Sequence, residues 1–276
     1  MPEIELTAGV IEYDDTGSGP TVVLLHGVAT DRSLWRHVVA DLGQDFRCVV
    51  PTLPLGGHRR PMLPEADLSL SGLAALVAEF LERLGLQEVT LVQNDAGVGL
   101  KLASQRPQRV SRLVIASCEA FENYPPGLPG RTLALAAKIP GGLNALAQPM
   151  RLRPLRRLPV AYGWMSKRPI PDAVTDAWLR PLLTSREVRR DLVKYLRSAR
   201  TAEMAAATQQ VSGFTRPVLV AWAAEDRVMP SRHGRRLAEL VPDGRLVQIT
   251  DSYTLIPEDQ PRELARAIRA FITETS

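Results

Sequence analysis

Residues 89–97 of the chain read VTLVQNDAG and combine a short apolar run with an abrupt turn. The β-branched and aliphatic residues at 89–94 are typical of a buried strand. Helical periodicity follows over 97–106, and a second apolar run follows at 112–118. This order predicts a strand, a tight turn at Asp95, a helix, and then a second strand parallel to the first.

The same alternation continues on both sides of this segment, and it predicts a mostly parallel sheet with helices on its faces. The first two strands are separated by little more than a turn, so we expect them to pair antiparallel at one edge. The expected strands are 3–8, 9–15, 21–26, 47–52, 89–94, 112–118, 217–222 and 245–250, and the expected helices are 34–42, 69–85, 97–106, 233–241 and 261–273.

The alternation breaks between about residues 121 and 212. This stretch is punctuated by proline and glycine, and it reads as short helices without a strand. We therefore expect one core domain, residues 1–120 and 213–276, with residues 121–212 inserted in it as a helical lid.

Charge is divided unevenly between these two parts. The chain has 34 basic and 30 acidic residues, a formal net charge of +4. Residues 121–212 alone carry 15 basic and 6 acidic residues, a net charge of +9, so the remainder is net −5. Such a patch suits an anionic substrate or partner protein, although solvated helix faces are the favoured interpretation. No nucleic-acid motif accompanies it, so we expect no nucleic-acid partner.

The composition is that of an ordinary globular protein. With 45% hydrophobic and 23% charged residues, the chain resembles neither a disordered nor a disulfide-stapled protein. No apolar run approaches the roughly 18 residues of a membrane-spanning helix, and the acidic amino terminus differs from a secretory signal. Cys48 and Cys118 lie in apolar runs and are expected to be reduced core residues. We expect a soluble cytoplasmic protein with no membrane partner.

Three landmarks follow predicted strands, at the edge where open α/β sheets bind their ligands. They are LLHGV at 24–28, QNDAG at 93–97 and WAAED at 222–226. Together they resemble the α/β-hydrolase fold over nearly the whole chain outside 121–212. The resemblance implies a mostly parallel eight-stranded sheet flanked by helices with an inserted helical lid. It places Asp95 at the nucleophile position of the family's strand-to-helix elbow.

An aspartate at the elbow implies chemistry at an sp³ carbon. Its carboxylate can open an epoxide or displace a halide, leaving an alkyl-enzyme ester, so the resemblance is to haloalkane dehalogenases and epoxide hydrolases. By the same resemblance, the backbone N–H groups of Val28 and Ala96 form an oxyanion hole. Gln93 stands where the elbow usually has a small residue. The alternative is that Asp95 only caps the following helix.

The set of residues expected to support Asp95 lacks one member, the histidine. The family's acid position matches Asp226, and Glu119 matches the position that some dehalogenases use instead, so both are candidates. The family's histidine lies in a segment that here reads DSYTLIPEDQP, residues 251–261, with Thr254 in the histidine position. Threonine cannot accept a proton near neutral pH, so it cannot be the base that activates water.

Four histidines remain in the chain. His58 follows two glycines on a loop after the strand 47–52, which makes it a candidate replacement base or substrate contact; the alternative is an exposed loop residue. His26 belongs to the oxyanion-loop motif and is expected to be structural. His37 and His233 are expected to be surface or packing residues.

The positions that bind substrate in relatives fit neither subtype. Val28 and Ala96 stand where dehalogenases usually place halide-binding residues, and Ala29 stands where epoxide hydrolases usually have proline. Tyr162 and Tyr195 do fall in the insertion, where epoxide hydrolases carry two acid tyrosines. The alternative for each tyrosine is simple packing in the lid.

Three functions remain open. The first is a hydrolase with Asp95 as nucleophile, acting on an apolar small molecule with an electrophilic carbon, most simply an epoxide. The second is a non-hydrolytic enzyme of specialised metabolism, catalysing a rearrangement, elimination, cyclisation or carbon–carbon coupling in the same pocket. The third is a catalytically inactive ligand-binding protein. No metal-ligand cluster or phosphate-binding loop is recognisable, so we expect no metal and no cofactor.

Overall fold

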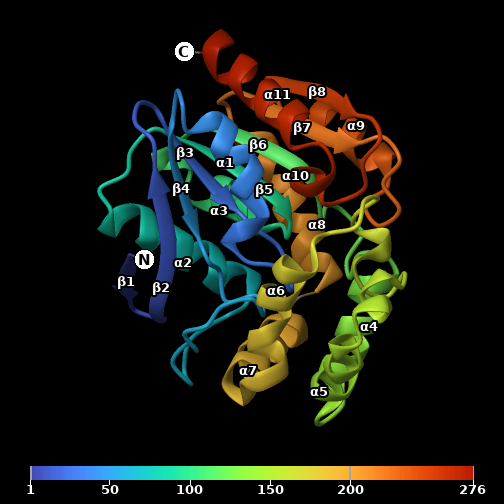
Figure 1. Ribbon diagram of the computed structural model, residues 1–276. Helices are drawn as coiled ribbons and strands as arrows, with labels where there is room; N and C mark the ends of the chain where they lie inside the picture. The colour runs from blue at the N-terminus through green and yellow to red at the C-terminus, as the bar shows by residue number, and fades with distance from the viewer. Residues whose placement is uncertain (1, 199, 276) are drawn as a thin grey trace.

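In residues 2–198 and 200–275, which the computed structural model describes, eight strands form one mostly parallel sheet. Their order is β1-β2-β4-β3-β5-β6-β7-β8 (Figure 1). β2 pairs antiparallel with β1 and with β4, and the other neighbouring pairs are parallel. The predicted parallel sheet and its antiparallel edge are both confirmed. The strands are β1 (Glu3–Leu6), β2 (Gly9–Thr16), β3 (Thr21–Leu25), β4 (Arg47–Pro51), β5 (Val89–Asp95), β6 (Val110–Cys118), β7 (Val218–Ala223) and β8 (Gly244–Ile249).

Helices connect the strands and cover the sheet (Figure 1). The five helices expected in the core are present within three residues of their predicted ends, although the first begins as the 3₁₀ turn η1 (Arg32–Trp35). Outside residues 121–212, the others are α1 (Arg36–Leu42), α2 (Leu70–Arg83), α3 (Val98–Gln105), η2 (Pro107–Arg109), α9 (Ser231–Leu240), α10 (Ile256–Asp259) and α11 (Pro261–Glu274).

Two hydrophobic cores form because successive strand residues point to opposite faces of the sheet. In β3, Val23 and Leu25 belong to the core that contains the apolar residues of α2, α3 and α9. Val22 and Leu24 belong to the other core, together with those of α1 and α11. All seven residues of β5 are buried, because this central strand is covered on both faces.

The chain from 121 to 212 runs from β6 to β7 as helices and turns, with no strand among its described residues. α4 and α5 lie on the opposite side of the view in Figure 1 from β1 and β2. We refer to residues 121–212 as the inserted segment. Its elements are α4 (Gly127–Lys138), α5 (Gly142–Ala147), η3 (Gln148–Arg151), η4 (Arg153–Arg157), η5 (Tyr162–Trp164), α6 (Asp172–Thr184), α7 (Arg186–Ser198), α8 (Thr201–Gln210) and η6 (Val211–Gly213).

Two further sequence expectations concern cysteine and membranes. Cys48 and Cys118 are buried and free, as expected of reduced core residues. Among the described residues, no helix combines the length and the apolar composition needed to cross a bilayer.

Candidate active site

The end of β5 is a strained turn that presents the Asp95 side chain. Asp95 has φ +69°, in the left-handed region that non-glycine residues rarely adopt. The Ala96 N–H donates to the Asn94 carbonyl at 3.0 Å, which closes the turn directly after the strand. A Cβ atom at Gly27 would lie only 2.1 Å from Asp95 Oδ2, so a glycine at 27 is needed for this placement.

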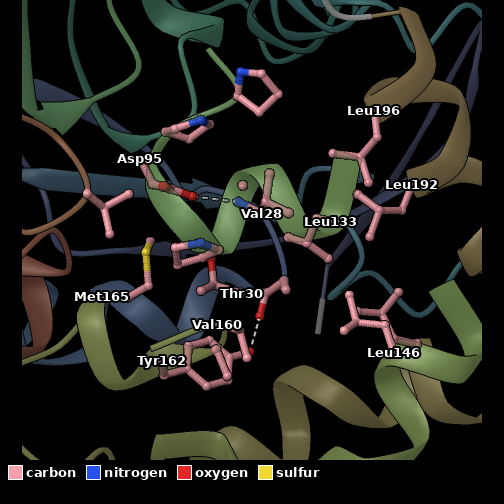
Figure 2. A pocket seen from close by; sticks show the side chains of 18 of the residues that line it. Val28, Thr30, Asp95, Leu133, Leu146, Val160, Tyr162, Met165, Leu192 and Leu196 are labelled. Atoms are coloured by element: carbon pink, nitrogen blue, oxygen red, sulfur yellow. Dashed lines mark hydrogen bonds between the residues drawn. The ribbon is translucent and has the colours of Figure 1, made fainter. Parts of the chain in front are cut away.

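The Asp95 carboxyl group does not cap helix α3. Asp95 Oδ2 accepts a hydrogen bond from the Val28 N–H at 2.9 Å (Figure 2). The residue before α3 is Gly97, and no side chain there accepts from the helix. The interpretation of Asp95 as a helix cap is therefore wrong, and its carboxyl group is held by a loop on the neighbouring strand β3.

Asp95 lies in a largely apolar pocket between the sheet and the inserted segment, which we call the Asp95 pocket. Its empty space is about 1070 Å³, including the part that opens to solvent. Aliphatic side chains from the inserted segment, among them Leu133, Leu146 and Leu192, line the pocket, and Figure 2 shows them on the side of Val28 away from Asp95. The residues that line the pocket include two carboxyl groups, Asp95 and Glu119, but no lysine, arginine or histidine.

Burial without a cation raises the pKa values of both pocket acids. Desolvation raises the pKa of Asp95 to about 6, and the negative charge of Asp226 adds to the rise, while the Val28 N–H opposes it. The pKa of Glu119 is held well above its usual range, by burial first and then by the charge of Asp95. The pocket therefore disfavours the charged form of both acids.

Glu119 follows β6 and is tied to the elbow through both its backbone and its side chain. Its N–H donates to the Asp95 carbonyl at 2.8 Å. Its Oε2 accepts from the Gly97 N–H and from the Tyr195 hydroxyl, each at 3.3 Å. Glu119 is only 3% exposed, so it is not a solvated loop carboxylate.

Asp226 and Thr254 form a second cluster beside the elbow. Thr254 Oγ1 donates to Asp226 Oδ1 at 2.7 Å, and the same oxygen accepts from the Val228 and Met229 N–H groups. Burial raises the pKa of Asp226 to about 6. The threonine thus contacts the acid that the resemblance would pair with a histidine. Neither Asp226 nor Thr254 lines the Asp95 pocket.

His58 is not an exposed loop residue and does not reach the pocket. It is 2% exposed, and its Nε2 lies 3.3 Å from Asp191 Oδ2 on α7, in the inserted segment. Its Nδ1 accepts from the Gly56 N–H. Both ring nitrogens are therefore engaged, and the Nε2 contact joins the core to the inserted segment. His58 is not among the residues that line the Asp95 pocket, so the structure separates it from the nucleophile position.

The other histidines lie where the sequence led us to expect them. His26 is structural: its Nε2 accepts from the Leu53 N–H at 2.8 Å, and its Nδ1 lies 2.8 Å from the Gly27 carbonyl oxygen. Burial lowers the pKa of His26 to about 4, so the ring is neutral. His37 is exposed and His233 is buried at the start of α9.

Two backbone N–H groups, those of Val28 and Ala96, are expected to form an oxyanion hole, and one of them is directed at Asp95. The Val28 N–H already donates to Asp95 Oδ2. The Ala96 N–H instead donates to Asn94 within the turn. Gln93, the departure from the elbow pattern, is accommodated because Gly99 has no side chain: a Cβ there would lie 2.5 Å from Gln93 Oε1.

The structure also identifies residues that the motifs did not single out. Asn94 Nδ2 donates to the Ala116 and Thr254 carbonyls, each at 2.8 Å, and so connects the elbow to the Thr254 loop. Tyr124 also lines the pocket. Tyr162, one of the two tyrosines already considered from the sequence, lines it as well, and its hydroxyl donates to the Ala29 carbonyl at 2.5 Å. Spacing alone could not reveal these contacts, because they join residues far apart in the sequence.

The described part of the chain brings no three histidine, cysteine or carboxylate side chains into a cluster suited to a metal ion.

A family model described as "alpha/beta hydrolase fold" matches residues 20–261, most of the chain. The chain belongs to the α/β-hydrolase fold family. Within that family it is related to haloalkane dehalogenases. It is 27% identical to haloalkane dehalogenase 2 of Mycobacterium tuberculosis, over 94% of this chain and 90% of the relative. It is also 25% identical to a cis-3-alkyl-4-alkyloxetan-2-one decarboxylase of Xanthomonas campestris, over 95% of this chain and 92% of that one.

Solved structures share the fold of this family member. A haloalkane dehalogenase variant from Bradyrhizobium elkanii superimposes with a TM-score of 0.80 at 18% identity, covering 99% of this chain and 96% of that one. A thermophilic esterase from Thermogutta terrifontis superimposes with a TM-score of 0.76 at 21% identity, covering 100% and 99%. At such identities the likeness concerns the fold, and the chemistry has to be argued from the side chains.

Proposed function

We propose that this α/β-hydrolase-family enzyme uses the Asp95 carboxylate as a nucleophile toward an electrophilic sp³ carbon of an apolar small molecule, most simply an epoxide. The observation that carries the proposal is the position of Asp95: a strained elbow and the Val28 N–H hold its carboxyl group in an apolar pocket without a cation. Such a carboxylate is weakly solvated, which favours attack on a neutral electrophile.

In the first step, an Asp95 oxygen attacks the epoxide carbon and the ring carbon–oxygen bond breaks. The electron pair of that bond moves to the epoxide oxygen, which must gain a proton. We assign that proton to Glu119, because it lines the same pocket and burial favours the protonated form of its carboxyl group. The products are an Asp95 ester and a Glu119 carboxylate.

In the second step, Glu119 accepts a proton from a water molecule that attacks the carbonyl carbon of the ester. The ester bond breaks, the second proton of the water passes to the leaving oxygen of the diol, and the Asp95 carboxylate is restored with Glu119 again protonated. Two features support this exchange of roles. Esterification removes the Asp95 charge that raises the pKa of Glu119, and the Gly97 N–H and Tyr195 hydroxyl both favour its carboxylate. In this assignment Asp226 and Thr254 position the neighbouring loops and do not transfer protons.

Intact-mass analysis with a panel of apolar epoxides and haloalkanes tests the proposal. We expect turnover by the wild-type protein and no turnover by Asp95→Ala. In Glu119→Gln we expect an Asp95 adduct to accumulate with haloalkanes, because halide displacement needs no proton from residue 119. A single turnover in ¹⁸O-labelled water should place the label on Asp95, because water attacks the ester carbonyl. Absence of both adduct and turnover across the panel would reject the proposal.

A non-hydrolytic reaction is the second candidate. The observation that favours it is that no histidine lines the Asp95 pocket, so the group that usually activates water is missing. One relative is named as an oxetan-2-one decarboxylase, and a decarboxylation adds no water to its substrate. The test is the product mass from a panel that includes disubstituted oxetan-2-ones. Asp95-dependent loss of 44 Da, roughly the mass of carbon dioxide, without gain of water would favour this candidate.

A further inference from the structure

One face of helix α4 carries a solvent-exposed stripe of aliphatic and basic side chains. Leu128, Arg131, Leu135 and Lys138 follow one another at intervals of three or four residues. Ile139, the residue after the helix, lies four residues beyond Leu135, so all five lie along one side of the helix and its carboxyl end. The exposed fractions of Leu128, Leu135 and Ile139 are 40%, 62% and 55%. Arg131 and Lys138 are exposed beside them.

Packing against the rest of the protein does not account for this stripe. The opposite side of α4 already supplies the internal contacts: Ala136 and Ala137 are buried, and Leu133 lines the Asp95 pocket. α4 therefore carries apolar side chains on both sides, and one side is open to solvent. Exposed apolar residues that gather in this way mark an interaction surface.

The turns that follow α5 repeat the same composition. Arg151, Leu152, Arg157 and Leu158 are exposed, and the two leucines are 65% and 42% exposed. α4, α5, η3 and η4 form a continuous chain of contacting elements. Of the seven large hydrophobic residues that are exposed in the described part of the chain, five lie in α4 and these turns. We call these nine residues the basic-apolar patch: five from α4 and its carboxyl end, and four from the turns.

The charge of the basic-apolar patch is not neutralised by neighbouring acids. Residues 123–171 contain eight basic residues and no acidic residue. Four of the eight cations pair with carboxylates of other segments. In residues 2–198 and 200–275, no carboxylate partner is present for the remaining four, which all belong to the patch: Arg131, Lys138, Arg151 and Arg157.

We infer that the basic-apolar patch binds the surface of a lipid bilayer that contains anionic headgroups. Unpaired cations suit the headgroups, and large aliphatic side chains interleaved with them suit the acyl boundary just below. Aromatic side chains, which stack on nucleic-acid bases, are absent from the patch. Because α4 also lines the Asp95 pocket, binding would bring the pocket next to an apolar phase. The expectation of no membrane partner rested on spanning helices, which surface binding does not require.

Co-sedimentation with vesicles tests this inference without any substrate, so it stands apart from the proposed chemistry. We expect the protein to bind vesicles of phosphatidylcholine mixed with phosphatidylglycerol at low salt, and to bind pure phosphatidylcholine vesicles far less. Binding should weaken at high salt because the attraction is screened. No binding to the mixed vesicles at low salt would overturn the inference.

Two double variants separate the two parts of the patch. Arg131→Gln with Lys138→Gln should weaken binding about 20-fold, since each basic residue near an anionic surface contributes about a fivefold change. Leu135→Ser with Ile139→Ser should weaken it at least 10-fold. All four positions are exposed, and retention of the wild-type melting temperature would confirm that both variants fold.

The matched control is Leu246→Ser with Arg235→Gln, an exposed leucine and an exposed arginine on the core. It should bind vesicles as the wild type does, and an equal loss in this control would contradict a specific patch. A second outcome would also overturn the inference. If the protein bound single-stranded RNA with the same affinity as the mixed vesicles, and the double variant Leu135→Ser with Ile139→Ser kept that RNA binding, the basic residues would be assigned to nucleic acid.

Discussion

Two groups of buried carboxylates in this protein have opposite surroundings. Asp191 on α7 accepts the Met62 N–H at 2.8 Å, faces His58 Nε2 at 3.3 Å, and pairs with Arg190 at 2.7 Å. These partners keep its pKa lower than usual despite its burial. Asp95 and Glu119 line a pocket without a basic residue, and burial raises both pKa values.

Asp191 joins two parts of the chain, whereas Asp95 and Glu119 are available for chemistry. A buried acid with a full set of donors stabilises the fold when ionised, and its removal leaves those donors unsatisfied. A buried acid with one or two weak donors is destabilised when ionised, and it has oxygen lone pairs free to react. Each prediction below tests whether the two groups differ in this way.

The largest effect is expected for Asp95→Ala. If the Asp95 carboxylate is the nucleophile, consumption of a reactive epoxide should fall at least 10³-fold with little change in folding. The measurement is kcat/KM, with circular dichroism to verify the fold. The control is Asp191→Asn, which should retain most activity if the protein folds. A residual rate above about one tenth in Asp95→Ala would place Asp95 among the structural carboxylates.

Asp191→Ala should lower the free energy of unfolding by about 3 kcal/mol, because it strands the Met62 N–H and removes the partner of His58. Urea unfolding near neutral pH measures the change. Asp172→Ala offers a control, since the Asp172–Arg153 pair is exposed and should contribute less than about 1 kcal/mol. Equal losses in the two variants would remove the structural role assigned to Asp191.

Asp95→Asn should have the opposite effect on stability, which grows from about pH 4 and is complete above about pH 6. The folded pKa of Asp95, about 6, exceeds its usual value of 3.8, so the folded state binds the proton more tightly. The wild type therefore loses stability as pH rises from about 4 to 6, by up to about 3 kcal/mol. Asp95→Asn cannot ionise and should be more stable than the wild type at pH 8 but not at pH 4. Urea unfolding at both values decides this, and a pH-independent difference would contradict it.

The pH dependence of turnover provides a further test. Only the carboxylate form of Asp95 attacks, so kcat/KM should rise about tenfold per pH unit below pH 6 and level off above it. Initial rates between pH 4.5 and 8 in constant ionic strength measure the profile. An inflection near pH 4, close to the pKa of an ordinary aspartate, would show that burial does not raise the pKa of the reacting acid.

The smallest effect is expected for Thr254→Val. It removes one of three donors to Asp226 Oδ1 and should cost about 1 kcal/mol of stability, measured by urea unfolding. Activity should change less than about tenfold, because Thr254 does not line the Asp95 pocket. A loss of about 100-fold or more would make the Asp226–Thr254 cluster part of the reaction and weaken the role proposed for Glu119.

Much of the fold could be predicted from local patterns. Residues 89–118 encode the strand, elbow, helix and next strand in one run, and β5 and β6 pair in parallel as neighbours. Individual side chains at the site were harder to place. His58 follows two glycines and reads as an exposed loop residue, yet α7, more than 120 residues later, covers it and supplies Asp191. Its environment depends on a contact that no local pattern contains.

The sequence by itself determined the alternation of strands and helices, the aspartate at the elbow, and the threonine in place of a histidine. It also determined the division into a net −5 core and a net +9 insertion. Tertiary structure decided the electrostatic state of each group, because desolvation and hydrogen bonding depend on what packs around a side chain. Only the tertiary structure shows that Glu119 lines the Asp95 pocket and that His58 contacts Asp191 outside it. It also shows that one side of α4 is open to solvent. Composition is additive along the chain, whereas burial is a property of the whole fold.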